Sequence, residues 1–250
     1  MTKFKDHFSG HAADYAKFRP DYPAELFDYL ASISPQRGLA WDCATGNGQA
    51  ATGLATYFDN VIATDASAQQ IGSARLHPRV SYRVAPAEQS EIDSDSVDLI
   101  LVAQALHWFD LNRFFTEAKR VLKETGKLAI SNYLHIRISP EIDALVSKFY
   151  RETTGPFWPP ERHLVETNFE STQFPFPELP SSQFEMRQQW DLDQLAGYLG
   201  TWSATKKFIA ARGFDPVDSF LEELRAIWGN PELPRQAIWP LQLRVFVPPS

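Results

Sequence analysis

Residues 39–51 read Leu-Ala-Trp-Asp-Cys-Ala-Thr-Gly-Asn-Gly-Gln-Ala-Ala. The segment starts apolar, passes an acid, narrows to small residues with two glycines and ends in an alanine-rich pattern. This order predicts a strand, a tight turn and the first turn of a helix. Glycines in such a turn let a ligand approach the backbone, and the free N–H groups at a helix start attract negative charge. The segment therefore predicts a nucleotide-type binding turn in an α/β sheet.

A second acid ends the next predicted strand. Residues 61–65 are a short β-branched run that finishes with Asp65, 17 residues after Gly48. An acid in this place can accept both hydroxyls of a ribose, so the two segments together predict an adenosine-type cofactor. Gly46, Gly48 and Ala51 also satisfy the permissive dinucleotide fingerprint G-x-G-x-x-A. A nicotinamide-dependent oxidoreductase is therefore an alternative.

Asp42 favours a cationic ligand, because a carboxylate four residues before Gly46 would face the pyrophosphate of a dinucleotide. At this point the chain resembles the class I S-adenosylmethionine-dependent methyltransferases, whose first motif is D-x-G-x-G-x-G after an apolar strand. Residues 42–48 read Asp-Cys-Ala-Thr-Gly-Asn-Gly, so Ala44 replaces the first glycine. The resemblance is strongest over residues 39–133. It is closest to small-molecule methyltransferases of the type-11 domain group, including members similar to trans-aconitate methyltransferase.

The resemblance implies a set of cofactor contacts along the chain. The methionine end of S-adenosylmethionine would be held by Asp42, Ala44, Gly46 and Gly48. The ribose would be held by Asp65 with Ala66 beside it, and the adenine by Ala87 with Glu88. Without the resemblance, Glu88 would be read as a solvated surface charge. Gln104 would line the floor of the site.

A lead-in before the first predicted strand also matches the family. Residues 15–23 read Tyr-Ala-Lys-Phe-Arg-Pro-Asp-Tyr-Pro, similar to a Y-x-x-x-R-P-x-Y-P segment that forms a lid in many members. By this resemblance Tyr15 and Arg19 would approach the cofactor's carboxylate or the substrate. A guanidinium can pair with a carboxylate through two parallel hydrogen bonds.

Candidate catalytic residues follow the fourth predicted strand. Residues 97–103 form a near-continuous apolar run, as expected of a buried parallel strand. His107 and Trp108 come after its carboxyl end, at the sheet edge that faces the ligand crevice. His107 would serve as general base for a hydroxyl acceptor if its pKa stays near 6.5. Trp108 would wall the pocket, and a purely structural role for His107 stays open.

The acceptor is left open between a carboxylic acid and a hydroxyl compound. A carboxylate needs no general base, and Arg19, Arg137 or His135 would then orient the acid. Residues 137–180 are rich in proline and aromatic residues, and family members insert a substrate cap at this place. Aromatic walls with few charges suit a small ligand. An ordinary helix and loop over a sheet edge is the alternative for this segment.

Five strands that alternate with helices predict a doubly wound parallel sheet. The resemblance extends this to an α/β fold with a mostly parallel, seven-stranded, Rossmann-like sheet, an antiparallel last strand at 241–247 and a small helical cap. Residues 1–250 would form one methyltransferase domain. Its predicted parts are a lid and leading helix (1–35), a cofactor-binding core (36–136), a cap insertion (137–180) and the final strands and helices (181–250).

The amino-acid composition limits the kinds of molecule that the protein can bind. The chain has 250 residues, 44% hydrophobic content and a net charge of −7, without a basic block, which disfavours nucleic acid. No apolar run approaches the length of a membrane span, so we expect a soluble, cytoplasmic protein. The single Cys43 excludes an intrachain disulfide and a multi-thiolate metal site. We expect a small-molecule substrate, S-adenosylmethionine, no metal, no membrane and a monomer or homodimer. A non-catalytic cofactor-binding protein and an interaction module are the remaining alternatives.

Overall fold

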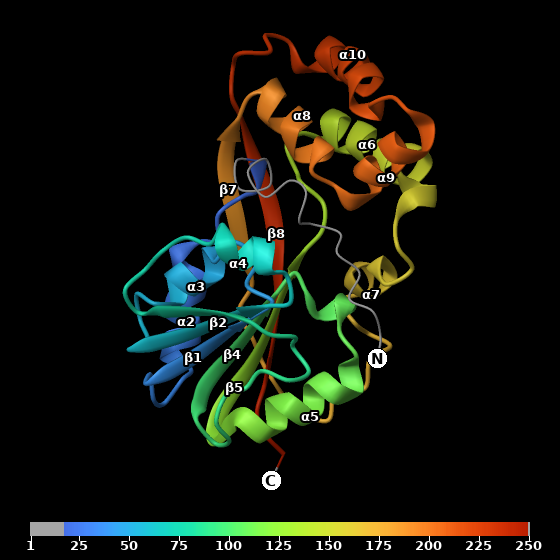
Figure 1. The fold of residues 1–250 in the computed structure, drawn as a ribbon. Helices are drawn as coiled ribbons and strands as arrows, with labels where there is room; N and C mark the ends of the chain where they lie inside the picture. The colour runs from blue at the N-terminus through green and yellow to red at the C-terminus, as the bar shows by residue number, and fades with distance from the viewer. Residues whose placement is uncertain (1–17, 250) are drawn as a thin grey trace.

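The computed structural model describes residues 18–249, which form an α/β fold around an eight-stranded sheet (Figure 1). The strands in chain order are β1 (Leu39–Cys43), β2 (Asn60–Asp65), β3 (Val80–Val84), β4 (Val97–Ala103), β5 (Leu122–Tyr133), β6 (Glu178–Leu179), β7 (Phe184–Trp190) and β8 (Arg235–Phe246). The α-helices are α2 (Ala24–Ser32), α3 (Gln49–Leu54), α4 (Ala68–Gly72), α5 (Leu111–Val121), α6 (Pro140–Lys148), α7 (Arg162–Glu166), α8 (Leu192–Gly200), α9 (Ser203–Arg212) and α10 (Pro216–Trp228). Short helical turns of other types are η2 (Leu106–Trp108), η3 (Phe149–Thr153) and η4 (Gly155–Phe157).

The sheet order is β3-β2-β1-β4-β5-β8-β6, with β7 also paired to β8. Strands β1 to β5 are parallel, and β8 runs antiparallel to β5, which confirms the predicted doubly wound sheet and its reversed last strand. Strands β6 and β7 lie one after the other along the same edge of β8, because Glu178 is opposite Phe246 and Phe184 is opposite Leu241. The eight strands therefore fill seven positions, and Pro180, which has no N–H to donate, separates β6 from β7.

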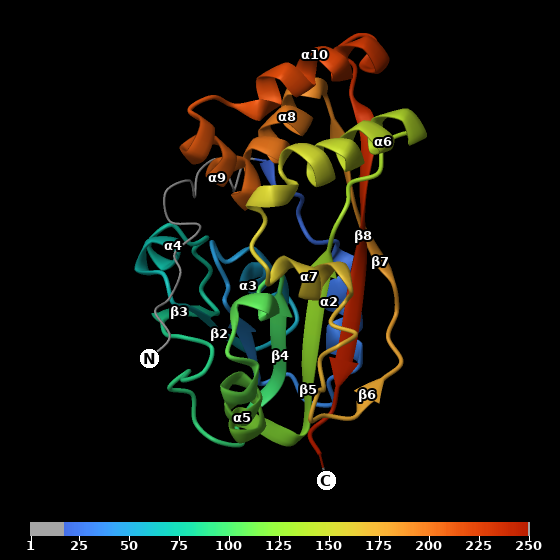
Figure 2. The ribbon, with the colours of Figure 1, turned by 90° about the vertical axis from the view of Figure 1, so that its right-hand side faces the viewer.

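Two apolar cores cover the two faces of the sheet. Helices α2 and α3 lie on one face, where Ala40 of β1 joins the first core. Helix α5 lies on the other face, where Trp41 of β1 joins the second core and its ring lies 6.4 Å from Phe114. Side chains of a strand alternate between faces, so a strand that is apolar throughout needs helices on both sides. Figure 2 shows α5 and α7 in front of the sheet and α2 behind it.

A layer of helices lies beyond the carboxyl ends of the parallel strands (Figures 1 and 2). Helix α6 comes from the predicted cap segment 137–180, whereas α8, α9 and α10 come from the C-terminal part of the chain. Aromatic side chains join the two groups, with Phe149 4.6 Å from Phe220 and 6.1 Å from Trp202 between ring centroids. We call α6, η3, η4, α7, α8, α9 and α10 the cap.

Two elements differ from the sequence-based expectation. Helix α9 was not predicted, since only Ala204 and Thr205 of it are buried and its pattern lacks a clear apolar stripe. Strand β8 begins at Arg235 rather than 241, because the buried-exposed alternation continues through Pro240. Within residues 18–249, no helix is both long enough and apolar enough to cross a membrane.

A buried acid ties the sheet together at the end opposite the cap. Asp98 in β4 is 2% exposed, and one of its oxygens accepts the backbone N–H groups of Gly38 and Leu39 at 2.9 Å each. Its other oxygen accepts from Lys123 Nζ at 2.6 Å. The carboxylate thus joins the start of β1 to the start of β5 across β4. A buried charge with this set of partners is costly to remove, because each partner would be left unpaired.

We predict that Asp98→Ala lowers the free energy of unfolding by about 3 kcal/mol, since two N–H groups and an ammonium lose their acceptor. Urea denaturation measures this loss. Asp28→Ala is the matched control, because Asp28 is exposed on α2. Equal stability of the Asp98 and Asp28 variants would contradict the role assigned to Asp98.

Candidate active site

The turn between β1 and α3 has a left-handed backbone at three positions. The φ angles are 58° at Ala44, 57° at Gly46 and 81° at Gly48. The positive φ at Gly48 strains any other residue, and a Cβ added there would also clash with the Tyr82 side chain, so the position favours glycine. Among residues 18–249, the nearest atom to a Cβ added at Gly46 is Gln70 Oε1 at 4.0 Å, so these residues leave open space over the turn. The turn therefore has the shape of a ligand cradle.

Ala44 adopts the one conformation that alanine tolerates poorly. A left-handed φ brings Cβ against the following carbonyl and costs about 1–2 kcal/mol for residues other than glycine. Strain of this kind persists where the surrounding contacts fix the backbone, and it is common at functional sites. Ala44 therefore occupies a position with glycine geometry, as the family motif implies.

Asp42 is buried below this turn, with 1% of its surface exposed. Its Oδ2 accepts a hydrogen bond from Thr45 Oγ1 at 2.5 Å. Burial raises the pKa of Asp42 from 3.8 to about 7, although the hydrogen bonds from Thr45 and from the Ala51 backbone act in the opposite direction. The carboxyl group therefore exchanges a proton near neutral pH, and a cation nearby would favour its ionised form.

Asp65 links the glycine turn to the end of β2. Its Oδ2 accepts the N–H of Gly46 at 2.9 Å, and its Oδ1 accepts the N–H of Ser67 at 2.8 Å. Ser67 in turn caps α4 by accepting from the N–H of Gln70, and Ala66 lies between the acid and this cap. An ionised carboxylate has about four acceptor positions, so one such group can hold backbone N–H groups and a ligand hydroxyl together.

The loop after β3 is fixed by two acids. Glu88 Oε1 accepts the N–H of Asp110 at 2.8 Å, just before α5. Glu117 of α5 accepts the N–H and the hydroxyl of Ser90 at 2.7 and 2.6 Å, and its pKa is lowered to about 2, chiefly by its hydrogen bond with Arg120. Ala87 is buried between these contacts. The predicted adenine loop is thus held rigidly at the carboxyl edge of the sheet.

Gln104 follows β4 in a left-handed conformation, with φ at 57°. Its backbone N–H donates to Ser131 O at 2.8 Å, and its side-chain Nε2 donates to Tyr133 O at 2.6 Å. The backbone contact joins the ends of β4 and β5, and the side-chain contact extends this link to the last residue of β5. Gln104 is therefore fixed at the carboxyl edge of the sheet, where it lines a pocket.

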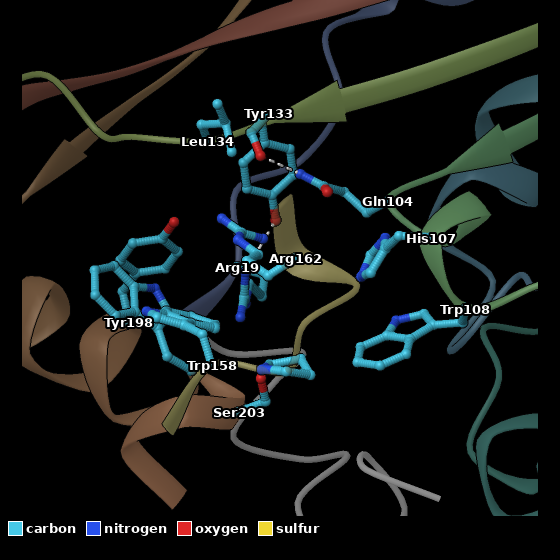
Figure 3. A pocket seen from close by; sticks show the side chains of 12 residues that line it. Arg19, Gln104, His107, Trp108, Tyr133, Leu134, Trp158, Arg162, Tyr198 and Ser203 are labelled. Atoms are coloured by element: carbon cyan, nitrogen blue, oxygen red, sulfur yellow. Dashed lines mark hydrogen bonds between the residues drawn. The ribbon is translucent and has the colours of Figure 1, made fainter. Parts of the chain in front are cut away.

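A pocket opens between this edge and the cap, and Figure 3 shows the side chains around it. Four predicted residues line it, namely Arg19, Gln104, His107 and Trp108. Sequence reasoning missed several other lining residues, which include Tyr133, Trp158, Arg162, Tyr198, Trp202 and Ser203. Most of the missed residues come from the cap, and their aromatic character is the one signal that the sequence offered. The walls are largely aromatic, as in many small-molecule sites.

Arg19 is held on one side of the pocket. Its Nη1 donates to the hydroxyl of Tyr133 at 3.2 Å and its Nη2 to Thr201 O at 3.5 Å. Its guanidinium carbon lies 5.1 Å from the centre of the Tyr198 ring, within the range of a cation–π contact. The other lid residue predicted by resemblance, Tyr15, lies outside the described residues.

His107 is 7% exposed and its ring lies 4.5 Å from that of Trp108. Burial, and next the charge of Arg162, lower the pKa of His107 to about 3. The expectation of an ordinary pKa near 6.5 is therefore wrong, because a desolvated imidazole beside a cation resists protonation. His107 is neutral at physiological pH and holds an added proton weakly. It can still donate or accept a hydrogen bond.

The predicted residues form two groups along one edge of the sheet. Asp42, Ala44, Gly46, Gly48, Asp65, Ala66, Ala87 and Glu88 gather at the ends of β1, β2 and β3. Arg19, Gln104, His107 and Trp108 line the pocket at the ends of β4 and β5. The two groups are neighbours because β1 pairs with both β2 and β4. Neither Arg137 nor His135, the other candidates to orient an acid, is among the residues that line the pocket.

Sites over the carboxyl edge of an open parallel sheet, with a glycine turn after the first strand and an acid after the second, bind adenosine-containing cofactors. Comparison with known proteins identifies the group. Residues 41–130 match the family model described as a methyltransferase domain. A Dictyostelium discoideum protein that carries a methyltransferase name is 37% identical over 227 residues, which cover 89% of this chain and 86% of the relative. The chain therefore belongs to the class I S-adenosylmethionine-dependent methyltransferases.

Solved structures agree with this assignment. One from Anaeromyxobacter dehalogenans, which carries the name of a type II methyltransferase, is 44% identical and superposes with a TM-score of 0.86. The match covers 92% of this chain and 98% of that one. A Haemonchus contortus phosphoethanolamine N-methyltransferase in complex with S-adenosylhomocysteine is 16% identical with a TM-score of 0.53. The match covers 100% of this chain and 61% of the Haemonchus protein. At this low identity the match supports the fold alone.

We predict that Ala44→Gly raises the free energy of unfolding by roughly 0.5–1 kcal/mol, because relief of the left-handed strain outweighs the added freedom of glycine in the unfolded chain. Chemical denaturation measures the change. Ala226→Gly, at an exposed position in the last turn of α10, is the control and should lower stability by up to about 1 kcal/mol. A loss of stability in both variants would show that Ala44 is not strained.

We predict that S-adenosylhomocysteine binds more tightly as pH rises. The ammonium group of the ligand favours ionised Asp42, whose pKa is about 7 in the free protein, so binding releases a proton below this pH. From about pH 6 to about pH 8 the affinity should rise up to about tenfold and then level off. Calorimetry in buffers of different ionisation enthalpy measures the proton release. Asp42→Asn should bind weakly and lose the pH dependence, and an unchanged pH profile in that variant would exclude Asp42 as its source.

Proposed function

We propose that this protein transfers the methyl group of S-adenosylmethionine to a small organic acceptor in the pocket beneath the cap. The observation that carries this proposal is the position of the pocket. It lies at the ends of β4 and β5, next to the glycine turn of β1, and its walls are aromatic side chains from the cap. A nucleic acid acceptor is disfavoured by the net charge of −7 and by the small, walled pocket.

The residues present fit the cofactor. The left-handed turn with open space over Gly46 would admit the methionine end, and Asp42 below it would face the ammonium group. Asp65 would accept the ribose hydroxyls, and the rigid loop at Ala87 and Glu88 would contact the adenine. Gln104 would form the floor beneath the methyl group. When bound, the cofactor supplies an electrophilic methyl group on a sulfonium.

The protein's own contribution is to align the acceptor and exclude water. In-line attack needs the acceptor atom opposite the sulfur, and a walled pocket can hold it there. The rings of Trp108, Trp158 and Trp202 border the pocket, where they would displace solvent around a bound acceptor. Positive charge disappears from the sulfur as the methyl group moves, so a pocket that is poor in water favours the reaction.

The state of His107 favours an anionic acceptor within this scheme. With a pKa near 3, His107 would be an inefficient general base for a hydroxyl at neutral pH. A carboxylate carries no proton to remove, and its oxygen can form the new bond to the methyl carbon while the carbon–sulfur bond breaks. The negative charge of the carboxylate and the positive charge of the sulfonium are both consumed. A carboxylic acid is therefore the acceptor class that we favour over a hydroxyl compound.

We predict that Asp65→Ala weakens binding of S-adenosylhomocysteine by at least about tenfold, because the ribose hydroxyls lose a charged acceptor. Calorimetric titration measures the affinity, and thermal denaturation shows whether the variant is folded. Asp59→Ala is the matched control, since Asp59 is an exposed acid just before β2. Near-equal affinity of a folded Asp65 variant and the wild type would remove Asp65 from the cofactor site.

A further inference from the structure

Arg162 presents a cation to the pocket from the cap. It is the first residue of α7, and its Nε donates to the hydroxyl of Tyr150 at 3.1 Å. Its guanidinium carbon lies 4.9 Å from the centre of the Trp158 ring and 5.8 Å from that of Tyr150. Within residues 18–249, no acceptor is found for its two terminal nitrogens. The guanidinium is thus fixed in position with donors to spare.

The described residues that line the pocket offer these donors no acid; Glu166 is bonded to the hydroxyl of Tyr150 and is not among them. Among the described residues that line the pocket there are two arginines and neither Asp nor Glu. Two further polar atoms, Trp158 Nε1 and His107 Nδ1, are buried without a hydrogen-bond partner in the part of the chain that the structure describes. Buried donors without partners are costly, and a cation in an aromatic pocket calls for an anion. The pocket is therefore complementary to a negatively charged group.

The two arginines do not have the same role. Arg19 already donates to the hydroxyl of Tyr133 and to Thr201 O, and it lies on the side of the pocket next to Tyr198. Within residues 18–249, the side chain of Arg162 donates one hydrogen bond, to Tyr150, whose hydroxyl in turn donates to Glu166. Its charge reaches His107, since it contributes to the low pKa of that residue. Arg162 is thus the arginine on the side of the pocket nearest His107, and its terminal nitrogens can still donate hydrogen bonds.

We infer that Arg162 and Trp158 form an anion subsite that binds a carboxylate of the methyl acceptor. The planar fork of a guanidinium matches a carboxylate, and the indole N–H of Trp158 adds a third donor. This inference rests on the proposed function and assigns a specificity-determining residue for its acceptor. Arg19 remains for the carboxylate of the cofactor, so each of the two acids has its own cation.

The shape of the subsite also limits the rest of the acceptor. Trp158 and Trp202 lie 5.6 Å apart between ring centroids, and Trp158 lies 4.9 Å from Tyr150. The π-helical turn η3 presents Tyr150 here, and Thr154 closes that turn by donating its N–H to Phe149 O at 3.0 Å. Flat aromatic walls beside a planar fork favour a planar acid over a bulky or branched one. The acceptor class is therefore a flat, unsaturated or aromatic carboxylate.

The test is calorimetric titration of the full chain saturated with S-adenosylhomocysteine. The probes are benzoate, trans-cinnamate and 4-hydroxybenzoate, and the neutral probes are the corresponding amides. We expect the acids to bind the wild type and the amides to bind at least about tenfold more weakly. Arg162→Gln should weaken acid binding by at least about tenfold, and Arg162→Lys should restore part of it because the charge remains without the fork. Trp158→Phe, which keeps an aromatic ring and removes the N–H, should weaken acid binding several-fold.

Arg225→Gln is the matched control, because Arg225 is exposed on α10 and its loss changes the net charge equally. This control should bind the acids like the wild type, and all variants should keep their affinity for S-adenosylhomocysteine within about threefold. Equal binding of acids and amides, acid binding that survives Arg162→Gln, or no binding of any acid at about 10 mM would each overturn the subsite. Failure of the wild type to bind S-adenosylhomocysteine would instead contradict the proposed function.

Discussion

The carboxylate of Asp65 is the contact on which the cofactor side of the site depends. Each of its oxygens accepts one backbone N–H, from Gly46 in the turn after β1 and from Ser67 before α4. Two loops that leave neighbouring strands are thereby held against the same acid, and the left-handed turn at Ala44 keeps its place despite the strain. Because a carboxylate offers about four acceptor positions, the group that shapes the turn can also face a ligand. Local folding and binding thus rely on one side chain.

The sheet could be predicted because its buried strands leave a direct trace in the sequence. The run over 97–103 is apolar except for Asp98 and became β4 residue for residue. The cap was harder to predict. Helix α9 buries little and therefore shows no stripe, while β6 is two residues long and is defined by its pairing with β8. Elements that depend on tertiary partners rather than on their own pattern are those that sequence reasoning misses.

The residues of the site likewise fall into those that a local sequence pattern marks and those that it does not. Asp42, Gly46, Gly48 and Asp65 lie close together in the chain and at strand ends, so their spacing alone pointed to a cofactor. Arg162, Tyr133 and Tyr198 meet in one pocket from three distant segments, and no local pattern marks them. Burial is likewise invisible in a sequence. His107 was expected to titrate near neutral pH, and its desolvation beside Arg162 moves its pKa to about 3 instead.

The distribution of charged side chains around the crevice favours one class of methyl acceptor. Acids lie at the ends of β1, β2 and β3, whereas Arg19 and Arg162 face the pocket under the cap. A cofactor with a cationic centre fits between these sides, and a carboxylate acceptor fits on the cationic side. Transfer of a methyl group from a sulfonium to a carboxylate cancels two charges, which a pocket poor in water favours over separated ions. A neutral hydroxyl would instead release a proton beside His107, which holds it weakly. Burial therefore makes His107 a poor general base. The same buried pocket suits a carboxylate acceptor, which has no proton to remove.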